Sequence, residues 1–311
     1  MTCKIAVYHQ TVPNKKNLEK TEMLQFFSTG ARQAGAAVTD VHGYQYVDAE
    51  VAVIQGWIAT DVQRPHLKLR NEVINYQLTR KKYVVTADSN LFLYADTINP
   101  QHYLRYSFNG VFPNTGIYCD TPINPARWGK IQQDLNINLK EYRSTGEHVL
   151  ICLQRNGGWS MGTQSVVNWA QTTIQQLRKY TKRPIILRAH PGDSQSRVYL
   201  KQLEPAATQL NFRISTNARL QDDLVDCWAV VNYNSSPTVA AAIEGYPVFV
   251  TDPDRSQCGE IANRDLTQIE SPVLFDRQLW VQRLAMSHWN FDELKSGEAW
   301  RHMQQFVRGR H

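Results

Sequence analysis

Short apolar segments alternate with longer amphipathic segments along most of this chain. In the first half, the apolar runs at 4–10, 36–41, 50–57 and 83–88 predict buried strands. Residues 18–34 and 66–79 carry the helical spacing of apolar positions. The stretch from 89 to 146 is rich in Asn, Pro, Gly and Tyr and shows no sustained period before about residue 130, which predicts long loops and an interdomain passage.

The second half alternates more regularly. Strands are predicted at 148–154, 184–190, 211–215, 227–234 and 247–252, and helices at 164–180, 196–208, 219–226 and 236–244. The tail from residue 276 is predicted to be helical. Two successive β/α blocks indicate an α/β protein with two doubly wound domains, which we expect at 1–140 and 141–275, with the helices of 276–311 crossing back to the first domain. Two such domains facing each other would form a central cleft.

Composition adds few constraints. The 311 residues are 42% hydrophobic and carry a formal net charge of +6, and the surplus favours a polyanionic partner such as nucleic acid. The five cysteines are scattered without a CxxC pair, which indicates neither a disulfide framework nor a zinc site. No metal-ligand spacing stands out, and no apolar run approaches the roughly 18 residues of a membrane span. We therefore expect a cytoplasmic protein without a bound metal or cofactor.

Candidate binding residues follow the predicted strands of the second half. Ligands of doubly wound sheets bind beyond the carboxyl ends of the strands, where glycines admit a phosphate and helix starts attract it. Each residue also has a structural explanation, as a turn, a helix cap or a core histidine. The candidates for donor binding are Arg155, Gly157, Gly158, Ser160, Arg188, His190, Asn234, Ser235, Ser236 and, for ribose hydroxyls, Glu244.

In the first half, the candidates concern the acceptor. His9 follows the first strand and is the preferred general base, because an imidazole accepts a proton at neutral pH. Asp88, after the strand at 83–88, is the second candidate base. Trp57 could stack on a sugar or an extruded base, and Arg105 and Asn109 belong to a loop suited to phosphates and bases. The structural alternatives are that His9 caps a loop, that Asp88 caps a helix starting at Ser89 and that Trp57 packs between the domains. Arg105 and Asn109 could instead lie in a solvated interdomain loop.

Three short motifs carry a resemblance to a known family. RAHP at 188–191, NSS at 234–236 and EGYPV at 244–248 resemble the His-Pro and Ser-Ser motifs of GT-B glycosyltransferases, which occur in polysialyltransferases, capsule Kdo transferases and teichoic-acid polymerases. The resemblance implies a GT-B fold of two Rossmann-like domains. It also implies that His190, Ser235 and Ser236 hold the phosphate of a UDP- or CMP-linked sugar, that Glu244 holds its ribose, and that His190 takes part in catalysis. The acidic base motif of the sialyl and Kdo families is absent.

A second resemblance concerns the acceptor. YLRYSFNGVFPNTG at 103–116 and SHWNFDELKSGEAWRHM at 287–303 resemble segments of tailed-phage glycosyltransferases. That resemblance implies transfer of a sugar, such as glucose or arabinose, to 5-hydroxymethylated pyrimidines of double-stranded phage DNA in the host cytoplasm. A cell-surface polysaccharide or teichoic-acid transferase, a nucleotide-sugar epimerase and a non-catalytic nucleotide-binding protein are the alternatives.

Overall fold

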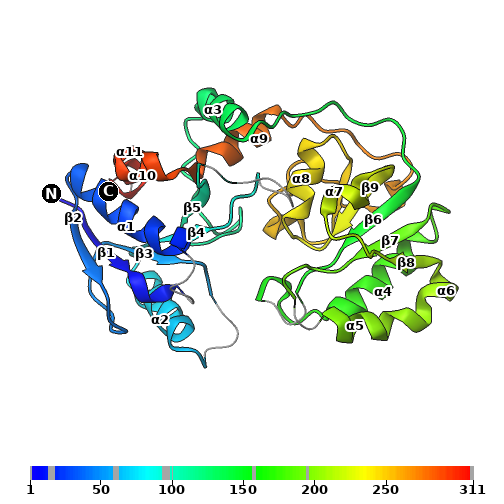
Figure 1. Cartoon of the computed structure of the whole chain (residues 1–311), viewed down its shortest axis with the longest axis horizontal. Helices are drawn as coiled ribbons and strands as arrows, with labels where there is room; N and C mark the ends of the chain where they lie inside the picture. Colours follow the sequence, from blue (N-terminus) through cyan, green and yellow to red (C-terminus); the bar gives the residue numbers. More distant parts are fainter. Residues whose placement is uncertain are drawn as a thin grey trace. The chain divides into compact units, whose positions relative to one another are not determined.

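The computed structural model describes residues 2–12, 18–58, 63–92, 99, 101–155, 159–193 and 196–308. The chain folds into two compact units, and each unit has its own sheet (Figure 1). The first unit takes residues 1–90, 99–136 and 281–311, and the second takes residues 91–98 and 137–280.

The first unit is a six-stranded sheet with helices on both faces. Its strands lie in the order β11-β5-β4-β3-β1-β2, of which β1 to β4 are parallel, whereas β5 runs antiparallel to β4 and β11 antiparallel to β5. The strands are β1 (Lys4–Tyr8), β2 (Ala37–Val41), β3 (Val51–Gln55), β4 (Tyr83–Asp88), β5 (Leu104–Phe108) and β11 (His288–Trp289). The helices are η1 (His9–Thr11), α1 (Leu18–Gln33), α2 (Pro65–Thr79), α3 (Pro125–Leu135), α9 (Gln278–Met286, of which the last six residues belong to this unit), α10 (Phe291–Lys295) and α11 (Glu298–Arg308).

Alternation along the central strands explains the two layers of helices. Val7 and Val53 face a core that includes side chains of α1, α10 and α11. Ala6 and Ile54, one residue away on each strand, face the side chains of α2. A Cβ at Gly30 of α1 would lie 1.7 Å from the carbonyl oxygen of Leu294, so the absence of a side chain there lets α1 and α10 touch.

The second unit is a five-stranded parallel sheet in the order β10-β9-β6-β7-β8. Its largest core cluster joins Val149, Ile151 and Val231 of the central strands to the apolar side chains of α4 and α5. The strands are β6 (His148–Cys152), β7 (Ile185–Arg188), β8 (Phe212–Ile214), β9 (Cys227–Asn232) and β10 (Val248–Val250). The helices are η2 (Trp159–Met161), α4 (Val166–Leu177), α5 (Ser196–Leu203), η3 (Glu204–Ala206), α6 (Ala207–Leu210), α7 (Leu220–Leu224), α8 (Pro237–Ile243), η4 (Pro253–Arg255) and η5 (Leu266–Gln268).

The region from 89 to 146 corrects the sequence-based expectation of loops. It contains strand β5 and helix α3, and the tail contains the short strand β11 as well as helices. All five residues of β5, LRYSF, are buried, including Arg105 and Ser107, so the polar residues of this alternating strand do not face solvent. Helix α3 begins at an Asn124 side chain that accepts from the Ala126 amide, with Pro125 at its first position.

Candidate functional site

Three neighbouring strands of the second unit end at one edge and carry most of the expected donor-binding residues. Strand β6 lies between β9 and β7, and all three run parallel. Their carboxyl ends therefore bring together the loop of Ser235 and Ser236, the loop of Arg155 and Ser160, and His190. Gly157 and Gly158 lie outside the described residues.

His190 is held in one tautomer by its own loop. Its Nδ1 accepts a hydrogen bond from the backbone N–H of Gly192, at 3.0 Å. Burial lowers the pKa of His190 below its usual value, the nearby charge of Arg155 lowers it further, and Asp193 opposes both. A neutral imidazole with Nδ1 as the acceptor carries its proton on Nε2. His190 can therefore donate one hydrogen bond from Nε2.

Arg155 lies beside this histidine and is exposed. A Cβ at Gly192 would lie 2.7 Å from Arg155 Nη2, so the guanidinium passes directly over the glycine. Together, the Nε2–H of His190 and the guanidinium of Arg155 can stabilise a phosphate.

The two serines differ in their surroundings. The Ser235 hydroxyl accepts a hydrogen bond from Asn232 Nδ2, at 3.0 Å, and the same amide donates to the Ser235 carbonyl. Ser236 is the N-cap of α8, but its side chain makes no capping hydrogen bond, and the residue is exposed. Its hydroxyl is thus not used by the helix, although Pro237 occupies the first helical position as in an ordinary helix start.

Asn234 is buried and joins three loops, so its role is to position them. Its Oδ1 accepts from Gln154 Nε2 at 2.8 Å, and its backbone N–H donates to Gln154 Oε1 at 2.9 Å. Its Nδ2 donates to the Ser160 carbonyl and to Asp252 Oδ2. The Ser160 hydroxyl also accepts from Gln154 Nε2. The side-chain amide of Asn234 is therefore occupied within the protein, contrary to the expectation of direct donor binding.

Arg188 also departs from the expected role. Its Nη1 donates to Asp223 Oδ2 at 2.5 Å and to the Asn217 carbonyl, and its Nη2 donates to the Ala218 carbonyl. Asp223 in turn accepts from Ser215 Oγ. The guanidinium therefore stabilises the β7 and β8 loops of the sheet, and we correct its assignment from donor binding to structure.

Glu244 lies at the opposite end of α8 from Ser236, away from the sheet edge where the ribose of a donor was expected. It is the C-cap of α8, whose other end starts at Ser236. The seven residues of α8 separate the two ends by about 10 Å. Glu244 forms an ion pair with Lys140, near the start of β10. The donor-binding assignment of Glu244 is therefore corrected to a surface ion pair.

In the first unit, His9 is oriented by a carboxylate. His9 Nε2 lies 2.8 Å from Asp40 Oδ1, and the His9 ring stacks on His42 with centroids 4.6 Å apart. Burial raises the pKa of Asp40, but hydrogen bonds from His9, Arg32 and Ser28 outweigh it and lower that pKa to about 2. An ionised Asp40 holds the proton of His9 on Nε2 and leaves the Nδ1 lone pair to accept a proton.

Asp40 is a residue that the sequence reasoning missed. It lies within the predicted strand at 36–41, and its strand β2 pairs with β1 so that Asp40 stands opposite Val7. The available signal was the position of an acidic residue near the carboxyl end of a strand next to β1.

Asp88 and Arg105 are brought together across two antiparallel strands. They are register partners on β4 and β5, and Arg105 Nη2 donates to Asp88 Oδ2 at 2.6 Å. Asp88 Oδ1 accepts from the backbone N–H of Ser89, but residues 89–92 form no helix. This bond to a buried guanidinium makes Asp88 a weaker candidate for the base than His9.

Trp57 and Asn109 lie at opposite edges of the first sheet. Trp57 follows β3, is half-buried and packs against the core on the α2 side of the sheet. Its backbone carbonyl accepts a hydrogen bond from Arg70 Nη1. Asn109 follows β5, which runs in the other direction, and its Oδ1 accepts from the Val84 amide at the start of β4. Asn109 is therefore not grouped with Arg105, and its side chain stabilises the sheet.

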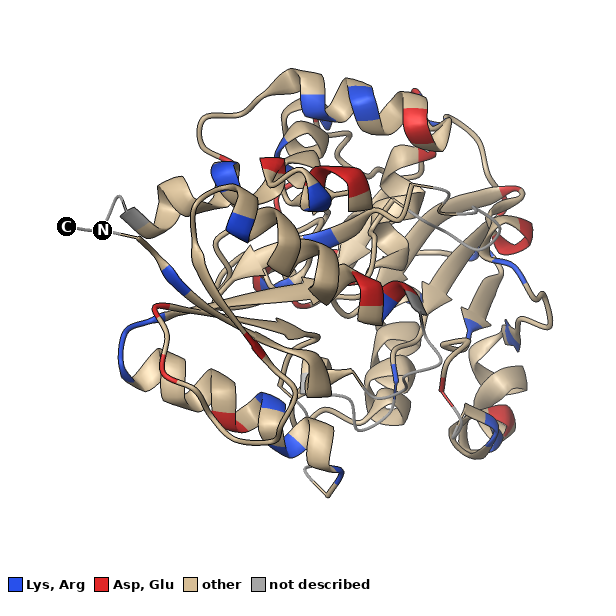
Figure 2. Cartoon of the chain, turned by 60° about the vertical axis from the view of Figure 1, so that its left-hand side comes forward, with Lys and Arg blue, Asp and Glu red and all other residues tan. Residues whose placement is uncertain are grey.

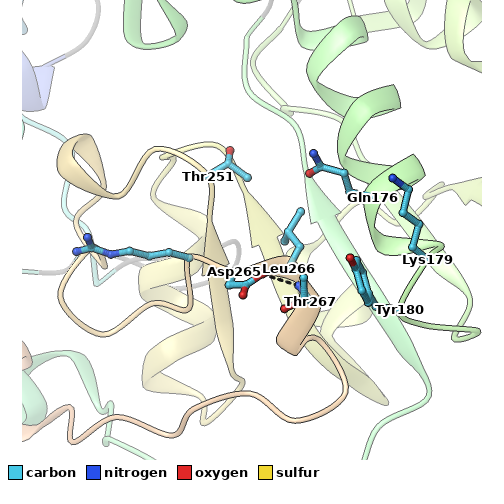
Figure 3. Close-up of a pocket in the computed structure, with 8 residues that line it drawn as sticks. Gln176, Lys179, Tyr180, Thr251, Asp265, Leu266 and Thr267 are labelled. Carbon is cyan, nitrogen blue, oxygen red and sulfur yellow. Dashed lines mark hydrogen bonds between the residues drawn. The ribbon is translucent and has the colours of Figure 1, made fainter.

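A pocket of about 420 Å³ lies elsewhere in the second unit, between the end of α4 and the segment at 264–267 (Figure 3). It contains none of the expected donor-binding residues. Its lining consists of Gln176, Lys179, Tyr180, Thr251, Arg264, Asp265, Leu266 and Thr267. Thr251 directly precedes Asp252, which bonds Asn234. The pocket therefore lies close in sequence to the loop of Asp252 but includes none of the residues expected to bind phosphate.

Three further observations concern charge, metal ligands and membrane-spanning helices. Lys and Arg are interspersed with Asp and Glu along the helices in Figure 2. Among the described residues, no group of three or more His, Cys, Asp or Glu side chains is placed to hold a metal ion. None of the helices there is long and apolar enough to cross a membrane.

No protein-family profile and no curated protein sequence matches this chain. Two solved structures from Thermosulfurimonas dismutans KpsC are similar to it over nearly their whole length. The β-Kdo 2,4 transferase shows a TM-score of 0.58 and 11% identity, over 93% of this chain and 92% of that chain. The β-Kdo 2,7 transferase shows a TM-score of 0.51 and 11% identity, over 98% and 100%.

At such low identity, the likeness concerns the fold. The mixed α/β architecture, the two parallel-stranded sheets and the likeness to these transferases confirm the expected fold class. The chain has a fold of the GT-B type, with two Rossmann-like domains.

Proposed function

We propose that this protein is a glycosyltransferase that moves a sugar from a nucleotide-activated donor to a hydroxyl group of an acceptor. The observation that carries the proposal is the single edge of the second sheet that collects His190, Arg155 and the Ser235–Ser236 loop. These groups offer hydrogen-bond donors and positive charge where doubly wound sheets bind phosphates. The names of the two KpsC transferases support the same class of reaction.

In the proposed reaction, His9 is the base. Its Nδ1 removes the proton from the acceptor hydroxyl while Asp40 stabilises the resulting imidazolium through Nε2. The acceptor oxygen then bonds to the anomeric carbon, and the bond between that carbon and the donor phosphate breaks. The negative charge that stays on the nucleotide is stabilised by His190 Nε2–H and Arg155.

Two acceptor classes are supported by different observations. A saccharide of a cell-surface polymer is favoured by the likeness to Kdo transferases. Hydroxymethylated DNA is favoured by the net charge of +6 and by the resemblance of two segments to phage enzymes. The mixture of basic and acidic residues along the ribbon in Figure 2 gives the DNA candidate no added support.

The test combines a panel of UDP- and CMP-sugars with two kinds of acceptor, hydroxymethylated duplex DNA and saccharides. Mass spectrometry of the products identifies any transferred sugar. We expect H190A to lower turnover about 100-fold, since it removes a donor to the leaving phosphate. E244Q is the matched control on the other end of α8 and should stay within about twofold. Donors that remain intact with every acceptor, while UDP still binds, would instead assign a non-catalytic nucleotide-binding protein.

A further inference from the structure

Two buried arginines both interact with Asp88, at the carboxyl end of β4. Arg70 of α2 is 8% exposed, and Arg105 of β5 is 4% exposed. Asp88 is the carboxylate that acts on both. It accepts a hydrogen bond from Arg105, and its charge partly offsets the burial that lowers the pKa of Arg70 to about 10. Among the described residues, the two guanidinium charges thus share one carboxylate, and one positive charge is left without an acidic partner.

Several N–H groups of these arginines have no acceptor. Arg70 Nε and both Nε and Nη1 of Arg105 are buried and find no hydrogen-bond partner within the described part of the chain. The remaining bonds of Arg70 go to uncharged oxygens, those of Thr11, Gln55 and Trp57. Buried donors in proteins are nearly always satisfied, so three guanidinium nitrogens without an acceptor, on two cations, favour an oxyanion as their partner.

The start of α2 makes the same place more positive. The 15-residue helix begins at Pro65 without a side-chain cap and without an acidic residue in its first turn. The pKa of His66, in that turn, is lowered by burial first and then by the charges of Arg70 and Arg64. A helix N-terminus and these cations all favour a negatively charged group.

We propose that Arg70 and Arg105 bind a single oxyanion of the acceptor, and that the acceptor is a saccharide carrying a carboxylate or a phosphate monoester. This inference rests on the proposed function. Duplex DNA presents a repeated row of exposed phosphates, which exposed cations match better than two buried guanidinium groups. The side chain of Asp88 is 34% exposed, so the anion can approach from the solvent beside it.

The strand order sets how far the acid lies from the reacting hydroxyl. Arg70 Nη2 bonds the carbonyl of Thr11, two residues after His9. Strand β5 is three strands away from β1, which corresponds to about 14 Å. An acid bound by Arg70 and Arg105 therefore lies on the reacting sugar or on the next one.

The experiment measures binding to the full chain of three probes: methyl β-glucuronide, methyl glucoside 6-phosphate and neutral methyl glucoside. We expect at least one charged probe to bind about 10- to 100-fold more tightly than the neutral one. R105Q should abolish this preference, and R105K should retain part of it. R301Q, on the exposed face of α11, is the matched control and should leave the preference unchanged.

UDP binding in the same samples separates the two proposals. Equal affinity for all three probes, with UDP bound, would overturn the acidic acceptor and leave the glycosyltransferase assignment intact. An Arg105-dependent preference without UDP binding would keep the anion site and overturn the donor site. If R105Q does not fold, R70K takes its place, because it keeps the charge but not the guanidinium geometry. Duplex DNA that displaces the charged probe from wild type would reassign the oxyanion to a phosphodiester and overturn the saccharide.

Discussion

His9 Nε2 lies 2.8 Å from Asp40 Oδ1, and Asp40 also accepts from Arg32 and Ser28. A carboxylate bound to one nitrogen of an imidazole fixes the ring and leaves the other nitrogen as the base. We expect D40N to lower kcat about 100-fold with little change in KM, because the amide can hold the ring in the wrong tautomer. Steady-state kinetics with the transferable donor measure the effect.

The matched control is D48N, which also replaces an ion-paired aspartate of the first unit. Asp48 pairs with Lys82, but its side chain is 70% exposed. D48N should leave kcat within about twofold. Equal losses in both variants would show that the first unit is generally sensitive to charge and would remove His9 as the base.

Asp40 also predicts a pH dependence of stability. Its folded pKa, about 2, lies below the usual pKa near 3.9, so the folded state binds fewer protons. The stabilisation is present above about pH 4 and is lost as the pH falls towards 2. Urea unfolding of wild type and D40N should differ in free energy of unfolding at pH 6, and the difference should shrink below pH 4 and vanish only below about pH 2. A constant difference across this range contradicts the assignment.

The α/β alternation was readable from the sequence because the central strands are continuous apolar runs, such as VAVIQ of β3 and HVLIC of β6. The grouping of His190 and Ser235 at one edge of the second sheet could be predicted from the sequence, because both residues directly follow predicted parallel strands. Strand β5 was missed because it has only five residues and lies in a stretch rich in Asn, Pro, Gly and Tyr, which favours loops. The roles of Arg188 and Asn234 depend on bonds to residues 35 and 80 positions away, which no local pattern contains.

The Arg188–Asp223 pair makes a prediction about stability. The Asp223 side chain is fully buried, and Arg188 is its charged partner at 2.5 Å. We expect R188M to destabilise the second unit by about 3–5 kcal/mol, because it leaves a buried carboxylate without its cation. The exposed Arg213 of β8 is the matched control, and R213M should change the free energy of unfolding by less than about 0.5 kcal/mol. Equal stability of the two variants would restore Arg188 as a candidate for ligand binding.

A bound nucleotide should shift the pKa of His190. Burial and the charge of Arg155 hold its pKa below the usual value, so His190 is neutral at pH 7. A diphosphate next to Nε2 favours the protonated ring, so we expect UDP to raise this pKa. NMR titration of the histidine ring signals, assigned with H190Q, measures the shift. A His190 pKa that UDP leaves unchanged would place the phosphates elsewhere.

The cysteines can report on each unit separately. All five are buried and none forms a disulfide, and burial raises the pKa of Cys152 and Cys258 to about 12 and that of Cys119 and Cys227 still further. Because thiolates are the reactive form, we expect native protein to resist Ellman's reagent. With increasing urea, mass spectrometry should show Cys152, Cys227 and Cys258 labelled together, since all three belong to the second unit. Cys119, in the first unit, should follow the unfolding of that unit. Rapid labelling of any of these four thiols at zero urea contradicts their burial.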